Sequence, residues 1–185
     1  MKKTVLVLGC LLAIGFSSVS CNRDDGLPES AVNIRSILPN RADHLIASML
    51  GEPIYDAGSG YTTKNTPNPF ASSEVYTGVS VTSVTKSATA NAANGAVYHV
   101  VLSNGIELGF KQDGDWAYVD GKGVLLKTSV WSYLPPAVDA AIRASSNSIT
   151  TIAKIEVSAA TPHVYTVTFQ SGAVAKYNAN GSVAP

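Results

Sequence analysis

Alternating hydrophobic and polar positions mark residues 98–110 as two antiparallel strands. Every second residue is apolar at 98–102, and the alternation resumes at 106–110. A period of two indicates a strand with one buried face. Asn104-Gly105, between the two runs, is typical of a two-residue type I′ hairpin turn, in which both residues have positive φ. We therefore expect a hairpin here, followed by a turn at Asp113-Gly114 and a further strand.

The same pattern recurs 67 positions later. An alternating run at 165–169 leads into Ser171-Gly172, and a second run follows at 173–177. Self-similarity at a fixed spacing is the mark of a repeated unit. Four pairs of landmarks keep this offset, namely Tyr98 and Tyr165, Gly105 and Gly172, Phe110 and Tyr177, and Gly114 and Gly181.

A helix is expected before each set of strands. Leu38-Pro39 and Leu134-Pro135 each precede apolar residues at helical spacing, and proline is tolerated in the first turn of a helix. The apolar stripes consist of Ala42, Leu45, Ile46, Met49 and Leu50 in the first helix, and of Val138, Ala141 and Ile142 in the second. Additional strands are predicted at 79–85 and 149–157.

The predicted fold class is α+β, with two tandem helix–antiparallel-meander repeats at 36–120 and 121–185. They would form one sheet with helices packed on one face and water on the other. The polar set Thr166, Thr168, Gln170 and Lys176 fits the solvated face. The two Leu-Pro pairs are 96 positions apart, so the first repeat holds an insertion of roughly 29 residues near 51–78. An irregular segment of that length is either functional or poorly ordered.

Residues 1–20 have the pattern of a signal peptide. Lys2-Lys3 precedes an apolar run that is too short to span a bilayer comfortably. Cys10 would leave with this leader, so that Cys21 is the one cysteine of the mature chain. Ser18-Val19-Ser20-Cys21 resembles a bacterial lipobox, with Ser18 where an aliphatic residue is usual. The alternative is ordinary cleavage with Cys21 as an incidental thiol.

Lipidation of Cys21 would make residues 21–35 a tether. Several acyl chains together hold a protein stably at a membrane. We therefore predict a lipoprotein of the cell envelope, attached to the outer membrane through its lipid anchor alone and facing the periplasm or the cell surface. Asp24-Asp25 resembles a surface-export signal, and a solvated tether explains these residues equally well.

The charge balance argues against nucleic acid as a partner. The chain has 13 basic and 13 acidic residues, and removal of Lys2 and Lys3 leaves 11 and 13, a formal charge of −2. Nucleic-acid binding needs clustered Lys and Arg that displace counterions. The sequence contains no such cluster.

The sequence contains no recognisable catalytic or metal-binding motif. It has no Gly-x-Ser-x-Gly elbow and no phosphate-binding glycine loop, and its histidines, His44, His99 and His163, lack metal-ligand spacing. The oxygen-rich residues Asp113, Asp115 and Asp120 fail the EF-hand pattern, and a hairpin turn explains Asp113-Gly114. We therefore predict no enzyme activity, no cofactor and no metal.

Aromatic residues are the candidate contact sites. The insertion aromatics have no periodic reason to be buried, and aromatic side chains on polar loops often contact proteins or glycans. Packing over the sheet is the alternative for them. Trp116, Tyr118, Trp131 and Tyr133 flank the connection between the repeats, where they could instead join the two halves. The candidate partner-binding residues are Tyr55, Tyr61, Phe70, Tyr76, Trp116 and Trp131.

Several of these segments resemble the PepSY-like, β-lactamase-inhibitor-like proteins, which are secreted or lipid-anchored proteins of gut-dwelling Gram-negative bacteria. The resemblance lies in residues 116–123, in the helix after Leu134-Pro135, in the run 152–157, and in the strand–turn–strand segments at 98–110 and 165–172. It covers about 37–183 and is best from Tyr98 onward. It implies paired α/β repeats in one antiparallel sheet, and it implies no established activity. The insertion, and Val174-Ala175 after the second turn, depart from the family pattern.

The leading functional prediction is a non-catalytic binding module for an unknown envelope or extracellular protein, with inhibition of that protein as one form of binding. The alternative is a carbohydrate- or small-ligand-binding accessory lipoprotein that uses the insertion aromatics Tyr61 and Phe70 as stacking platforms. An enzyme assembled from dispersed residues is the least favoured hypothesis.

Overall fold

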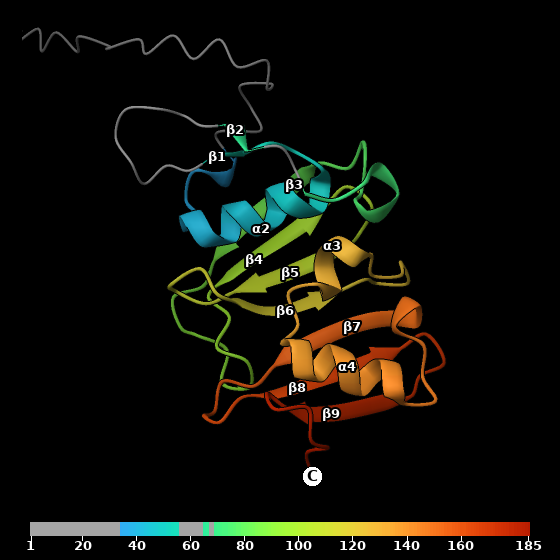
Figure 1. Ribbon diagram of the computed structural model, residues 1–185. Helices are drawn as coiled ribbons and strands as arrows, with labels where there is room; N and C mark the ends of the chain where they lie inside the picture. Colours follow the sequence, from blue (N-terminus) through green and yellow to red (C-terminus); the bar gives the residue numbers. More distant parts are fainter. Residues whose placement is uncertain (1–33, 56–64, 67–68) are drawn as a thin grey trace, which may run out of the picture.

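The computed structural model describes residues 34–55, 65–66 and 69–185 (Figure 1). The predicted signal peptide, the predicted lipidation site Cys21, most of the predicted tether 21–35 and Tyr61 of the insertion lie outside the described residues. Ile34 and Arg35 of the predicted tether are described. Arg35 is nearly buried and forms ion pairs with Asp43 and Glu52, so the folded part of the chain already includes this residue.

One antiparallel sheet of seven strands forms the centre of the protein, and its strands are hydrogen-bonded in sequence order. This arrangement confirms the predicted α+β class and the continuous antiparallel sheet. Each strand pairs with the next one along the chain, as a meander requires. The strands are β3 (Val81–Lys86), β4 (Tyr98–Leu102), β5 (Glu107–Phe110), β6 (Trp116–Asp120), β7 (Ile152–Val157), β8 (Val164–Phe169) and β9 (Val174–Asn178).

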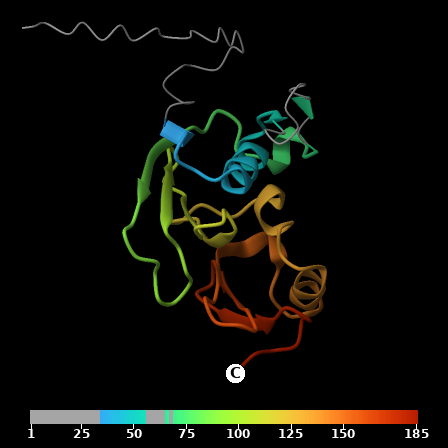
Figure 2. The ribbon, with the colours of Figure 1, turned by 90° about the vertical axis from the view of Figure 1, so that its left-hand side faces the viewer.

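Three helices cover one face of this sheet, as the two views of the ribbon show (Figures 1 and 2). They are α2 (Asn40–Leu50), α3 (Thr128–Trp131) and α4 (Pro136–Ala144). The stripe predicted for the first helix is buried throughout, and Val138 and Ile142 of the second are fully buried. The insertion contributes the two-residue strands β1 (Ile54–Tyr55) and β2 (Asn65–Thr66) and the short turn η1 (Ser72–Glu74), and a second short turn, η2 (Ile149–Thr151), precedes β7.

The inner face of the sheet carries an unbroken row of apolar residues across all seven strands. Because each residue is the direct cross-strand partner of the next, the row follows from the register. Its members are Val84, Val100, Leu108, Val119, Ile155, Val167 and Ala175. The five central members are at most 1% exposed. They belong to one core that includes residues from both halves of the chain.

The hairpin turns differ from the type I′ geometry predicted for Asn104-Gly105. Gly105 has φ of 89°, but among the described non-glycine residues Lys122 is the one with positive φ. The Gly105 N–H donates to Leu102 O at 2.9 Å, and the Leu102 N–H donates to Ile106 O at 2.9 Å. These bonds define a three-residue loop that ends in a left-handed residue, which is the next most common hairpin connection. An Asn-Gly pair is compatible with the two-residue type I′ turn and with this three-residue loop. The sequence therefore did not distinguish the two geometries.

The same three-residue turn occurs at four places in the sheet. Gly105, Gly114, Gly172 and Gly181 all have positive φ, and each donates its N–H to the residue three positions before it. The four turns form two pairs 67 positions apart, in the register of the sequence repeat. In the first half of the chain α2 precedes four strands of the large sheet, and in the second half α3 and α4 precede three.

The loop between β3 and β4 crosses to the second half of the protein. The Asn94 side chain is 5% exposed, and its amide nitrogen donates to Glu156 Oε1 of β7 at 2.9 Å. Its oxygen accepts from the Ala96 N–H, and the Ala159 N–H donates to Ala93 O at 2.8 Å. Together these bonds hold the loop against the end of β7. None of the helices in the described residues is long and apolar enough to cross a membrane.

Replacement of Asn94 by alanine should destabilise the protein by about 1–3 kcal/mol, because it leaves buried polar groups unpaired. Urea denaturation of the variant, compared with the unchanged protein, measures this difference. Thr89→Ala, an exposed site in the same loop, is the matched control and should change little. Equal midpoints for Asn94→Ala and the unchanged protein would show that the loop contributes no such contact.

Candidate functional site

Two described members of the predicted partner-binding set, Tyr76 and Trp131, bond to the same segment, residues 125–127, between the two halves. Trp116 pairs with Phe110 and packs on Tyr165, with ring centroids 6.4 Å apart. Trp131 is half-buried in α3, where its indole N–H donates to Leu126 O at 3.1 Å. Phe70 is half-buried in the insertion. Tyr55 lies in β1, and its side chain, like all of Tyr61 and Cys21, is outside the described part of the chain.

Tyr76 is a buried structural residue, which corrects its prediction as a partner contact. Its side chain is 4% exposed. Its hydroxyl donates to Leu125 O at 3.0 Å and accepts from the Lys127 N–H at 3.0 Å. The Lys127 ammonium lies 5.3 Å from the ring centroid and donates to Val75 O at 2.7 Å. Tyr76 therefore fastens the end of the insertion to the connection between the halves, as the packing alternative predicted.

The open face of the sheet presents the densest polar arrangement in the described residues. Two rows of cross-strand partners face away from the helices. One row contains Thr85, His99, Gly109, Tyr118, Glu156, Thr166 and Lys176. The other contains Ser83, Val101, Glu107, Asp120, Lys154, Thr168 and Val174. We call these two rows the open face.

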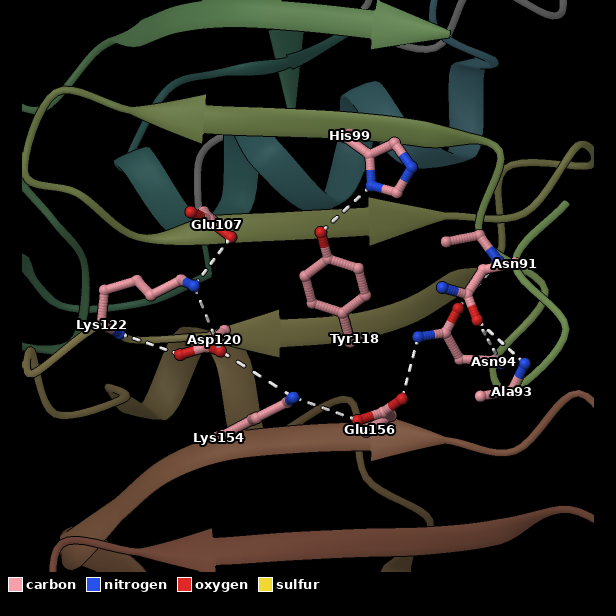
Figure 3. Close-up of polar contacts among 11 residues, drawn as sticks. Asn91, Ala93, Asn94, His99, Glu107, Tyr118, Asp120, Lys122, Lys154 and Glu156 are labelled. Carbon is pink, nitrogen blue, oxygen red and sulfur yellow. Dashed lines mark hydrogen bonds and ion pairs between the residues drawn. The ribbon is translucent and has the colours of Figure 1, made fainter. Parts of the chain in front are cut away.

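Tyr118 lies at the centre of the open face and reaches across two strands (Figure 3). Its ring lies directly over Gly109 of β5, where an added Cβ would be 2.1 Å from the ring atom Cε1. Because glycine has no side chain, the ring can lie on the strand itself. The hydroxyl then reaches β4, where it is 3.2 Å from His99 Nδ1. Sequence reasoning placed His99 outward and gave Gly109 no role.

A chain of ion pairs crosses the open face beside Tyr118. Lys122 Nζ lies 3.1 Å from Glu107 Oε2 and 3.8 Å from Asp120 Oδ2. Lys154 Nζ lies 3.8 Å from Asp120 Oδ2 and 3.1 Å from Glu156 Oε2. We call these five residues the charge ladder (Figure 3). Carboxylates and ammonium groups alternate along it, and Asn94 binds its last carboxylate. Exposed ion pairs of this kind contribute little to stability, because water and salt screen them.

The charge ladder shapes the electrostatics around Tyr118. Burial raises the pKa of the Tyr118 phenol above its ordinary value and is the largest effect. The negative charges of Glu107, Asp120 and Glu156 raise this pKa further. The hydrogen bond from Lys122 to Glu107 raises the pKa of the lysine. Tyr118 therefore stays protonated at physiological pH, and its hydroxyl remains a donor and acceptor.

The open face is suited to contact and lacks a recognisable catalytic arrangement in the described residues. His99 pairs with a tyrosine, and His163 Nδ1 lies 3.0 Å from Ser158 O and 2.9 Å from Ala160 O. The aspartates weighed for calcium have other partners: Asp113 binds the Asp115 N–H, Asp115 pairs with Arg41, and Asp120 belongs to the charge ladder. Among the described residues, no three His, Cys, Asp or Glu side chains are placed to hold a metal ion.

A family model described as "Putative beta-lactamase-inhibitor-like, PepSY-like" matches residues 96–184. The match extends from β4 to β9 and contains Tyr118, Gly109 and the whole charge ladder. It confirms the resemblance inferred from the sequence for this part of the chain. The insertion, α2 and β3 lie outside the match. No curated protein matches the chain.

Two solved structures from Bacteroides match this chain over part of its length. A "putative periplasmic protein of unknown function" from Bacteroides vulgatus is 20% identical, with a TM-score of 0.51 over 82% of this chain and 92% of that chain. A "putative calcium-regulated periplasmic protein" from Bacteroides thetaiotaomicron is 20% identical, with a TM-score of 0.39 over 48% and 64% of the two chains. The first of these likenesses shows that the fold is shared.

Gly109→Ala should displace the Tyr118 ring, because the new methyl group would occupy the space of the ring. The hydrogen bond to His99 should be lost with it, and NMR signals of the His99 ring report this loss. Tyr118→Phe keeps the ring over Gly109 and removes the hydroxyl, so both variants should shift the His99 signals in the same sense. His99 signals that respond to Tyr118→Phe and not to Gly109→Ala would contradict the close packing.

Tyr76 provides a test at high pH, because burial raises its pKa to about 12 from the ordinary 10. The folded state therefore binds the phenol proton more tightly than the unfolded state. This stabilisation is complete below about pH 10 and is lost as the pH rises through about 12. In Tyr76→Phe the absorbance titration should lose a phenol that ionises near pH 12, and stability should fall less steeply across this range. A phenol near pH 12 that persists in Tyr76→Phe would contradict the assignment.

Proposed function

We propose that the protein is a non-catalytic binding module of the cell envelope, because a PepSY-like, β-lactamase-inhibitor-like family model matches its residues 96–184. In this proposal a protein partner binds to the open face of the sheet. Binding becomes inhibition when it covers a functional surface of the partner. The single observation that carries the proposal is the central, half-exposed Tyr118 surrounded by paired charges, on a face that none of the described helices covers.

The composition of the open face supports a protein partner. Interfaces favour tyrosine as an anchor, with polar groups around it that exclude water. Tyr118 has this position, since the charge ladder lies beside it and threonines continue both rows on β8. The side chains are also held in place before binding, by Gly109 beneath the ring and by mutual ion pairs. Fixed side chains lose less entropy when they bind.

The location in the envelope rests on the leader and on the structural neighbours. The pattern at 1–20 and Cys21 supports export and lipidation. One solved protein with a similar fold, from Bacteroides vulgatus, is described as a putative periplasmic protein. An outer-membrane lipoprotein that faces the periplasm or the cell surface is the form of this proposal that fits the tether best.

We also propose that the two halves, 36–120 and 121–185, are copies of one unit. The shared order of helix and strands supports this, as do the two pairs of identical turns 67 positions apart. The sheet that results is about twice as wide as one copy could form. In this proposal duplication created the middle of the open face, because the charge ladder includes β5 and β6 of one half and β7 of the other.

Site-specific photo-crosslinking in the native envelope tests the binding proposal. A photoreactive amino acid at Thr168 lies on the open face, and one at Ala140 lies on the exposed side of α4 as the matched control. We expect a discrete protein adduct from Thr168 and none from Ala140, identified by mass spectrometry. The second change Tyr118→Ser should abolish the adduct. Adducts of equal yield from both positions, or none from Thr168, would refute binding through this face.

A further inference from the structure

The ring of Tyr118 has one covered face and one open face. Gly109 lies against the covered face, and Figure 3 shows the ring nearly face-on between β5 and β6, with its hydroxyl over β5. The second face therefore points away from the sheet. Tyr118 is half-buried, so part of its side chain is accessible. An aromatic ring face carries negative charge density and attracts cations within about 6 Å.

Three other aromatic rings in the described residues have a cation from the same chain. Lys86 lies 5.1 Å from the centroid of Tyr98, Lys127 lies 5.3 Å from that of Tyr76, and Arg143 lies 5.2 Å from that of Trp131. No described lysine or arginine lies over Tyr118 in this way. The two nearby ammonium groups, Lys122 and Lys154, bind carboxylates of the charge ladder instead.

The charge ladder has one negative charge in excess. It contains three carboxylates, Glu107, Asp120 and Glu156, and the two lysines that alternate with them. All three carboxylates act on Tyr118, since each raises the pKa of its phenol. A positive group placed over the ring would therefore be attracted by the ring and by the surrounding field together.

We propose that the open face recognises a cationic side chain of its protein partner, an arginine that stacks on the outer face of Tyr118 beside Glu156. This inference rests on the proposed function and names the chemistry of its partner. Arginine fits better than lysine, because a planar guanidinium can stack on a ring and donate to neighbouring carboxylates at once. Glu156 is the direct cross-strand neighbour of Tyr118, so it is placed to accept such a bond.

The order of charges along the ladder argues against a second copy of this chain as the occupant. The sequence of signs is negative, positive, negative, positive, negative, and it is symmetric about Asp120. A two-fold axis through the middle of the ladder would place like charges opposite each other, which is unfavourable. A partner with an excess positive charge is the better match.

Titration of the purified, isotope-labelled protein with a capped Thr-Thr-Arg-Thr-Thr peptide tests this inference by NMR. The control peptide replaces arginine by citrulline, which has nearly the same shape and no charge. We expect the arginine peptide to shift the amide signals of Gly109, Tyr118 and Glu156, and to bind more weakly as salt rises. The citrulline peptide should bind at least about fivefold more weakly, and Tyr118→Leu should weaken arginine binding by a similar factor.

Lys176→Gln, at the far end of the same row, is the matched control and should leave arginine binding unchanged. Equal binding of the two peptides, or arginine binding that survives Tyr118→Leu in a protein with an otherwise unchanged spectrum, would overturn the inference. Two results distinguish a failure of the arginine inference from a failure of the proposed function. Crosslinking at Thr168 without arginine binding would refute the arginine site alone, whereas arginine binding without any Thr168 adduct would refute the protein-binding function.

Discussion

The pairing of β6 with β7 is the contact on which the rest of the structure depends. It joins two sets of strands whose helices lie on the same face, through Tyr118 and Glu156, Val119 and Ile155, and Asp120 and Lys154. Val119 and Ile155 are both essentially inaccessible, so this pair continues the apolar row from one half into the other. Without it each half would expose a sheet edge and part of its core. The loop that carries Asn94 reinforces the same junction from outside the sheet.

One register produces both faces at this junction. Successive residues of a strand point to opposite sides, so the alignment that buries Val119 against Ile155 also places Tyr118 beside Glu156 and Asp120 beside Lys154. A shift of one residue would expose the apolar row and bury the charges. Burial of the core therefore fixes the position of the charge ladder, although the ladder itself contributes little stability. Its value lies in the arrangement of charge around Tyr118.

The aromatic residues on the helix-covered face and on the open face have different surroundings. Aromatic residues on the covered side are used internally: Tyr76 fastens the insertion to the connection between the halves, and Trp116 and Trp131 pack against the core. Tyr118 differs from them because glycine lies under its ring and carboxylates lie around it. These surroundings motivate the proposed cationic partner.

The local pattern of the sequence was sufficient to predict the strands, their buried faces, the two main helices and the positions of the turns. A period of two or of 3.6 residues is a property of neighbouring residues, so it can be recognised without the tertiary structure. It did not distinguish the type of turn at Asn104-Gly105, since both geometries accept the same residues. It also misjudged Tyr76, whose burial depends on Lys127, 51 positions away. Only the tertiary structure revealed the charge ladder and the contacts of Tyr118 with Gly109 and His99. Their members lie on different strands, and only the register between strands, set by burial of the shared core, brings them together.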